Sequence, residues 1–416
     1  MSMDDVYLLD LINGISGALD YVSSAVTGHH RRVGIASAVM AESLDLGPRD
    51  ATDLVIAGLL HDIGAFSLDL KLDGLDFDAD LTEHSLVGYK LLKGHPLLTH
   101  AADMVKYHHT PWRDMLENPD KTDNNTLFLG NVLNLMDRVD VLGKIGSHVF
   151  DHQRIRDVIG GYSNNIYAER AIEGFMEASA TSQFWERVED PHTPVRELIG
   201  NGFSDQPIPE EQLLNFSRFF SYIIDFRSRH TATHSQGVAE TAVQLARLAG
   251  MSTQDQQRMR LAGNLHDIGK LAVPITLLDK PSALKPEEFT SVQYHAQVCE
   301  RVLHSIPGLE DIADWACEHH ERLNGRGYPH GKRGHELSLG SRIMAVADVY
   351  TAITEDRPYR DGMAPEEARK VLRTLANAGS LDPDFVGLAL DNYEQIDAIR
   401  SIAQARALRE FKLFRS

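Results

Sequence analysis

Apolar side chains recur at helical spacing along most of the chain, and the alternating patterns typical of strands are scarce. Residues 33–40 and 238–246 both place apolar positions three and four apart, which is the spacing of one helix face. Gly47-Pro48 follows the first of these segments, and Pro286 opens another helix with an acidic first turn. The pattern therefore predicts an all-α fold.

A stretch rich in proline and glycine divides the chain at residues 191–209. At 416 residues the chain is too long for one ordinary core, and two domains are the default. We therefore predict a first domain at 1–190, a linker at 191–209 and a second domain at 210–416. Residues 388–414 read as one long helix that would pack on its domain or form a dimer.

The same series of histidines and aspartates occurs twice in one order. The intervals between successive positions are 32, 23, 24 and 29 residues in the first series and 32, 29, 24 and 29 in the second. Three intervals of four agree, which indicates a tandem duplication with one six-residue insertion. The first series is His29, His61-Asp62, His84, His108-His109 and Asp137, and the second is His234, His266-Asp267, His295, His319-His320 and Asp348.

The charge and the cysteine content limit which partners and which cellular compartment are expected. The net charge is −19, of which residues 1–208 carry −16 and residues 209–416 carry −3, so that binding to polymeric nucleic acid is disfavoured. The two cysteines, Cys299 and Cys317, fit a reducing compartment and exclude a disulfide scaffold. We expect no membrane span, no secretory signal and a cytoplasmic location.

Imidazole nitrogens and carboxylate oxygens in such number indicate a metal centre in the second half. Asp267 has two oxygens and can bridge two ions. We expect one ion on His266, Asp267 and Asp348 with His234 close by, and a second on Asp267, His295, His319 and His320. Two divalent ions can activate water and clamp a phosphoryl group for in-line displacement. Without thiolate ligands, iron or manganese is favoured over structural zinc.

Two further features point to a phosphate ligand. Lys270, three residues after Asp267, is placed to stabilise charge on a phosphate oxygen. Residues 319–329 contain Gly327, Tyr328 and Pro329 in a tight loop whose backbone can approach a ligand closely. Tyr328 would either stack on a base or pack the loop.

Residues 228–362 resemble an HD-GYP domain, the metal-dependent phosphodiesterase branch of the HD superfamily. The resemblance implies hydrolysis of a cyclic dinucleotide, cyclic di-GMP or 3′,3′-cyclic GMP-AMP, to its linear form, with catalytic roles for Asp267 and Lys270. It also implies that Arg357 and Arg360 contact ligand phosphates, although a surface ion pair is the alternative. The matching stretches are 230–235, 266–270, 319–329, 347–350 and 356–360.

Three positions depart from the family pattern. Asn324 takes the place of an aspartate in the loop and keeps its turn-forming capacity. His230 replaces a glutamate that supports a third metal in the family, which favours two ions, and a role of His230 itself as a ligand is the alternative. Thr351 stands where many enzymes that cleave cyclic di-GMP carry an aspartate, which argues against selectivity for guanine alone and makes cyclic GMP-AMP a candidate substrate.

The first half keeps every metal-type position but loses the remaining machinery. Ala65 replaces Lys270, and Thr110 through Asp114 replace the Gly-Tyr-Pro loop. The preferred interpretation is a metal-binding, inactive domain that regulates its partner. The alternatives are a structural remnant without ligands and an independent phosphohydrolase.

We therefore expect a bacterial signalling phosphodiesterase, with a homodimer as one form of assembly. A metal-dependent phosphohydrolase of mononucleotides and a sensor that binds the dinucleotide without cleaving it are the alternatives from other functional classes.

Overall fold

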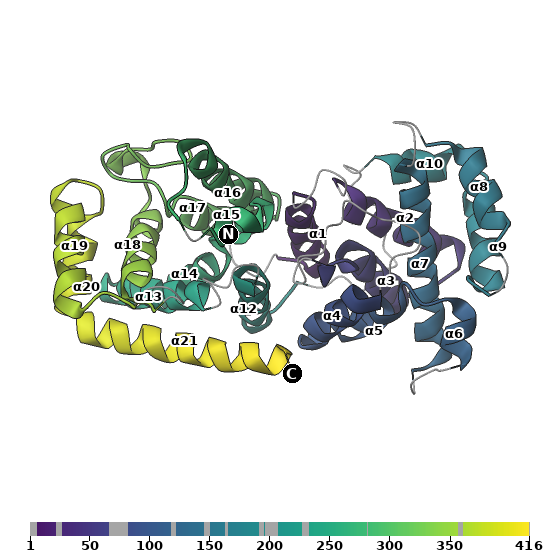
Figure 1. Ribbon diagram of the computed structural model, residues 1–416, viewed down its shortest axis with the longest axis horizontal. Helices are drawn as coiled ribbons and strands as arrows, with labels where there is room; N and C mark the ends of the chain where they lie inside the picture. Colours follow the sequence, from purple (N-terminus) through teal and green to yellow (C-terminus); the bar gives the residue numbers. More distant parts are fainter. Residues whose placement is uncertain are drawn as a thin grey trace. The chain divides into compact units, whose positions relative to one another are not determined.

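The regular structure of the protein is helical throughout the described part of the chain. In the computed structural model these described residues are 6–21, 27–65, 82–117, 122–144, 150–162, 165–190, 195, 207–226, 233–280, 282–356 and 361–415. Within them, extended residues pair only as the two isolated bridges Tyr7–Pro207 and Asn324–Arg333. The predicted all-α class is confirmed (Figure 1).

The chain forms two compact units, which we describe separately. The N-terminal unit is Tyr7–Pro207, and the C-terminal unit is Ile208–Ser416 with Met1–Val6. Most of the predicted linker, 191–209, lies outside the described residues, so the domain bounds stay a prediction.

In the N-terminal unit, α2 packs against α3 and α7, and α4 packs against α5. Its helices, with one 3₁₀ turn η4, are α1 (Leu8–Leu19), α2 (His29–Ser43), α3 (Pro48–Leu60), α4 (Thr82–Lys93), η4 (Pro96–Leu98), α5 (Thr99–Tyr107), α6 (Trp112–Glu117), α7 (Asn124–Lys144), α8 (His152–Gly160), α9 (Glu169–Ala178) and α10 (Ser182–Glu189).

In the C-terminal unit, α13 is central and packs against α14, α18 and α21. The elements are α12 (Glu210–Phe226), α13 (His234–Leu248), α14 (Thr253–Leu265), η6 (Ile268–Ala272), α15 (Ile275–Leu278), α16 (Pro286–His304), α17 (Glu310–Cys317), η7 (Gly334–Glu336), α18 (Leu339–Thr354), α19 (Pro365–Asn377), α20 (Pro383–Asp391) and α21 (Tyr393–Arg415).

The expected single helix over 388–414 is wrong at its beginning. Helix α20 ends at Asp391, and α21 begins at Tyr393 after Asn392. The Asn392 side chain donates a hydrogen bond to the Leu388 carbonyl, a local bond that competes with continuation of the helix.

Local chemistry sets several helix starts that matter for the site. Pro286 occupies the first turn of α16, as predicted, and Pro48 opens α3. Ser252 caps α14 by accepting a hydrogen bond from the Asp255 amide, and Ser338 caps α18 in the same way. These caps set where the helices that carry ligand-type residues begin.

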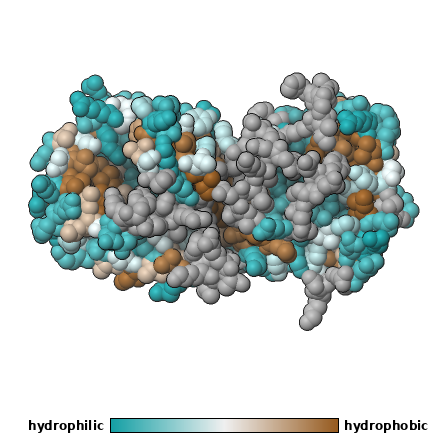
Figure 2. All heavy atoms as spheres, in the orientation of Figure 1, coloured by the Kyte–Doolittle hydropathy of each residue, from teal (hydrophilic) through white to brown (hydrophobic). Residues whose placement is uncertain are grey.

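The described helices include no candidate for a membrane span. None of them combines the length and the apolar character that crossing a membrane requires. On the face shown in Figure 2, hydrophilic residues are interspersed with hydrophobic patches.

Candidate metal centres

Five helices of the C-terminal unit bring the predicted ligands to one place. Four ligand positions lie within three residues after a helix end, where the chain turns toward the centre. His234 begins α13, His266 and Asp267 follow α14, His295 lies in α16, His319 and His320 follow α17, and Asp348 lies in α18.

Three of these histidines are oriented by the backbone of their own helix. The Nδ1 atom of His266 bonds the Gly263 carbonyl at 2.8 Å, and His295 and His319 make the same bond three residues back, to Val292 at 2.5 Å and Ala316 at 2.6 Å. A ring held this way carries its proton on Nδ1 and presents the Nε2 lone pair to the centre.

The atoms turned inward are buried and lack hydrogen bonds. The Nε2 atoms of His266, His295 and His319 and the Asp267 Oδ1 are all buried, and none has a hydrogen-bond partner among the described residues. Such atoms carry a large desolvation cost unless a partner satisfies them. A divalent cation suits this set of nitrogen and oxygen donors.

The donor atoms fall into three overlapping groups, in each of which all atoms lie within 4.8 Å of one another. They are His234 with His266 and Asp348, His266 with Asp267 and His319, and His295 with His319 and His320. The first group contains three residues expected around the first ion, and the last group contains three residues expected around the second ion. The middle group combines residues of both expected sites.

Asp267 is held in its charged form by its neighbours in the centre. Burial alone would raise the pKa of its carboxyl, but His266 and Lys270 more than offset this and hold the pKa well below its usual range. The Lys270 Nζ lies 2.5 Å from the Asp267 Oδ2, and the His266 Nε2 lies 3.2 Å from the same oxygen. Asp267 is thus an anion that Lys270 neutralises in part.

His234 joins the centre to a carboxylate that the sequence interpretation missed. Its Nε2 lies 3.3 Å from Asp348 Oδ1, while Nδ1 lies 3.1 Å from both oxygens of Glu355. Burial lowers the pKa of His234, but Glu355 and Asp348 raise it to about 10 in the absence of a cation. A carboxylate behind a ligating imidazole is a common support of metal sites.

The predicted loop lies against the histidines. The Tyr328 ring is 4.6 Å from the His320 ring, measured between centroids. A Cβ on Gly327 would lie 2.4 Å from the Arg322 nitrogen, so only glycine fits there. The peptide bond before Pro329 is cis. Arg357, Arg360 and His230 lie outside the described residues.

Glu321 builds this loop and was also missed. The residue is fully buried, and its carboxylate accepts hydrogen bonds from the backbone amides of His330, Gly331 and Lys332 at 2.7, 3.1 and 3.0 Å. It follows His319-His320 directly, which was the available signal. A buried carboxylate that collects backbone amides fixes the loop's path.

Two of the positions that depart from the family pattern have clear structural roles. Thr351 is fully buried, and its hydroxyl bonds Thr241 at 3.4 Å. The Asn324 side chain accepts a hydrogen bond from the Arg326 amide at 3.1 Å, which preserves the expected turn.

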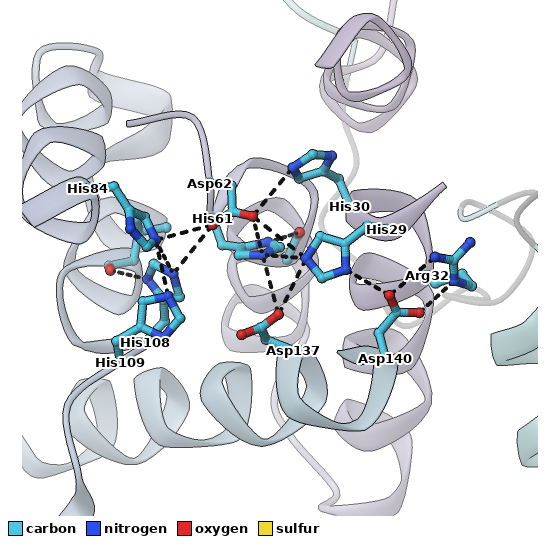
Figure 3. A network of polar contacts seen from close by, with 12 residues as sticks. His29, His30, Arg32, His61, Asp62, His84, His108, His109, Asp137 and Asp140 are labelled. Carbon is cyan, nitrogen blue, oxygen red and sulfur yellow. Dashed lines mark hydrogen bonds and ion pairs between the residues drawn. The ribbon is translucent and has the colours of Figure 1, made fainter. Parts of the chain in front are cut away.

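The N-terminal unit repeats the arrangement with its own residues (Figure 3). Two groups of donors form, each with all atoms within 4.8 Å: Asp62 with His84, His108 and His109, and His29 with His61 and Asp137. His61 and His108 are oriented like their counterparts, through Gly58 at 2.8 Å and Val105 at 2.7 Å.

Inward-facing nitrogens in the N-terminal unit approach one another closely. The His29 and His61 Nε2 atoms are 3.1 Å apart, and the His84 Nε2 is 3.0 Å from that of His109. Lone pairs that converge in this way suit a shared cation. His29 is held from behind by Asp140, whose Oδ2 lies 2.7 Å from Nδ1.

Comparison with known proteins matches both units to the HD domain family, a metal-dependent family, over residues 26–142 and 218–385. A 3′3′-cGAMP-specific phosphodiesterase 1 from Vibrio cholerae is 32% identical over 92% of this chain and 90% of its own length. A cyclic di-GMP phosphodiesterase from Pseudomonas aeruginosa is 40% identical over 37% of each chain.

A solved structure shares the fold over nearly the whole chain. It is a cyclic GMP-AMP specific phosphodiesterase of Vibrio cholerae, with a TM-score of 0.64 and 20% identity, covering 97% of this chain and 98% of that one.

Proposed function

We infer the function from one premise: the chain belongs to the family of HD-domain cyclic dinucleotide phosphodiesterases. It is a metal-dependent phosphodiesterase that hydrolyses a cyclic dinucleotide second messenger. We place the reaction in the C-terminal unit, with the linear dinucleotide as product. The observation that carries this placement is the convergence of four buried, unsatisfied ligand atoms beside Lys270 and the Gly327–Pro329 loop.

The donor set supports two ions, of iron or manganese, held by His234, His266, Asp267, His295, His319, His320 and Asp348. These donors are oxygens and imidazole nitrogens without a thiolate, which is compatible with either metal. When bound, the ions supply Lewis-acid polarisation of the phosphoryl group and activation of water.

The chain's own residues orient the reaction. The ammonium group of Lys270, held at Asp267, provides positive charge for a phosphate oxygen. Tyr328 offers an aromatic face beside His320 on which a base can stack. Glu355 and the backbone carbonyls keep the imidazoles turned toward the centre.

We propose 3′,3′-cyclic GMP-AMP as a substrate, with cyclic di-GMP as the second candidate. The full-length similarity to a 3′3′-cGAMP-specific enzyme supports the first. Thr351 carries no carboxylate, but it is fully buried against Thr241, so the substrate proposal rests on the similarity.

For the N-terminal unit we propose metal binding at His29, His61, Asp62, His84, His108, His109 and Asp137 without the main hydrolytic role. The loss of the lysine at Ala65 supports this division. The homodimer and the cytoplasmic location stay predictions.

Side-by-side turnover of cyclic di-GMP, 3′,3′-cyclic GMP-AMP and cyclic di-AMP, with added manganese or iron, tests the proposal. We expect cleavage of cyclic GMP-AMP by the wild type and its loss in Asp267→Ala, which lacks the shared carboxylate. Asp62→Ala serves as the matched variant in the other unit and should keep cleaving.

Full activity of Asp267→Ala would refute the site. Binding of the dinucleotide without cleavage would indicate a sensor, and hydrolysis of mononucleotides alone would indicate the other phosphohydrolase class.

A further inference from the structure

Besides Ala65 and Lys270, the two units differ beside the first metal-type histidine, where His30 of one corresponds to Ser235 of the other, and an aspartate holds each of these residues. Asp20 lies nine residues before His29, and Asp225 lies nine residues before His234, so that the two aspartates correspond in the duplication. Asp225 accepts hydrogen bonds from the Ser235 hydroxyl at 2.8 Å and the Ser235 amide at 3.1 Å.

At the position of Ser235, the N-terminal unit carries His30. Its Nδ1 lies 2.9 Å from the Asp20 Oδ1, so the aspartate holds the imidazole as its counterpart holds the serine. The longer side chain carries a second polar atom inward, and His30 is fully buried. An Asp–His pair therefore replaces an Asp–Ser pair.

The inner nitrogen of His30 reaches the central aspartate of this unit (Figure 3). The His30 Nε2 lies 3.7 Å from the Asp62 Oδ2, while the Nε2 atoms of His29 and His61 lie 3.6 and 3.2 Å from the same oxygen. Three imidazoles thus surround one carboxylate oxygen.

The equivalent oxygen in the C-terminal unit has different neighbours. The Asp267 Oδ2 faces the His266 Nε2 at 3.2 Å and the Lys270 Nζ at 2.5 Å. In the N-terminal unit the lysine position holds the buried, neutral Ala65. Beside its central aspartate, the N-terminal unit has therefore gained an imidazole, which can ligate a metal. It has lost the ammonium group, which cannot ligate a metal.

We propose that His30 is an additional ligand of a divalent cation in the N-terminal unit, beside His29, His61, Asp62 and Asp137, with Asp20 as its positioning residue. The carboxylate on Nδ1 gives His30 the carboxylate–histidine arrangement found behind metal ligands. This inference rests on the proposed binding of metal by the N-terminal unit.

The extra ligand changes which cation the unit prefers. By their distances to the Asp62 and Asp137 carboxylates, the imidazoles of His29, His30 and His61 would give this ion three imidazoles and two carboxylates. The corresponding donor group in the C-terminal unit has the two imidazoles of His234 and His266. Imidazole-rich sites favour the later first-row divalent ions such as Co²⁺, Ni²⁺ and Zn²⁺ over Mn²⁺. The two units would therefore select different metals.

Titration of the full chain with Co²⁺ tests the role of His30. The double variant His266→Ala/His319→Ala removes at least one ligand from each of the three C-terminal donor groups, so that bound Co²⁺ reports on the N-terminal unit through its visible absorption. In this background, His30→Ser, which installs the residue of position 235, should weaken Co²⁺ binding by at least the factor of about 10 to 100 that is typical when only the partner behind a ligand is removed. X-ray absorption should show fewer imidazoles per ion.

His100→Ser is the matched control, because His100 is also held by an aspartate, Asp53 at 2.8 Å, but its other nitrogen faces Thr126. Its Co²⁺ affinity and spectrum should not change. Asp20→Asn keeps the imidazole and should weaken binding by a smaller factor, and this variant decides the matter if circular dichroism shows that His30→Ser does not fold.

Unchanged Co²⁺ affinity and spectrum in both His30→Ser and Asp20→Asn would overturn the role of His30 alone. Failure of the parent double variant to bind any Co²⁺ would overturn the metal occupancy on which the inference rests.

Discussion

Lys270 is the residue that most clearly separates the two units. Its ammonium group lies against Asp267, and burial, which alone would lower its pKa, is outweighed by Asp267, so that the pKa of Lys270 is raised and the charge is retained. Ala65 offers no charge at the corresponding place. The difference predicts that only the C-terminal unit has a lysine side chain that can stabilise negative charge developing on a phosphate oxygen.

Lys270→Ala should lower kcat by about 10²- to 10³-fold, the typical cost of removing one group that stabilises transition-state charge. The metal content, measured by elemental analysis, should not fall, because Lys270 is not a ligand. Lys93→Ala removes an exposed ion pair with Asp103 in the other unit and serves as the control. Equal loss of kcat and metal in Lys270→Ala would contradict a charge-stabilising role.

Asp225 predicts a pH dependence of stability. Burial raises the pKa of its carboxyl to about 7 in the metal-free protein, from an ordinary value of 3.8. Between these values the folded state binds a proton that the unfolded state has released. The free energy of unfolding should therefore fall as pH rises from about 4 to 7, with a contribution of up to about 4 kcal/mol.

Asp225→Asn should remove this contribution and gain stability relative to the wild type at pH 8 more than at pH 5. Urea denaturation with a chelator present measures the two differences. A difference that does not change with pH would show that Asp225 is not the group responsible.

At the scale of elements, the glycine of the His-Asp-Ile-Gly stretch allows the helix that carries the next histidine to pack closely against this stretch. A Cβ on Gly269 would lie 1.8 Å from the His295 carbonyl oxygen, and one on Gly64 would lie 2.0 Å from the His84 carbonyl oxygen. In both units the turn after the central aspartate thus packs directly on the backbone of the helix that carries the next histidine.

Gly269→Ala should force α16 away from η6 and with it the His295 Nε2, which lies 3.7 Å from Asp267 Oδ1. We expect a loss of about 1–3 kcal/mol in the free energy of unfolding, together with reduced metal content. Gly387→Ala is the control, because nothing lies within 4 Å of its added Cβ, and it should stabilise helix α20 by about 0.5–1 kcal/mol. Wild-type stability and metal content in Gly269→Ala would contradict the close packing.

At the scale of the whole molecule, duplication predicts two metal centres in one chain. If each unit binds a pair of ions, elemental analysis of the metal-loaded protein should give about four ions per chain. Asp62→Ala should lower the count by about two while turnover persists. A wild-type count of about two, unaffected by Asp62→Ala, would show that the N-terminal unit holds no metal.

The sequence by itself determined the helical class, the tandem repeat and the seven metal-type positions of each unit. The physical reason is that these features are recorded in local spacing: apolar periodicity marks helices, and the residues at helix ends, such as His266-Asp267, recur at nearly constant intervals. The break at Asn392 was missed because one asparagine within a helical pattern does not by itself end a helix. In the structure its side chain bonds the Leu388 carbonyl.

Only the tertiary structure decided what supports those positions. Glu355 meets His234 across 121 residues of sequence, and no spacing rule connects two residues joined only by the packing of α13 against α18. The repeat does not single out His30, because Ser235 takes its place in the second series and adjacent positions on a helix point in different directions. The fold turns His30 toward Asp62, since Asp20 holds its outer nitrogen.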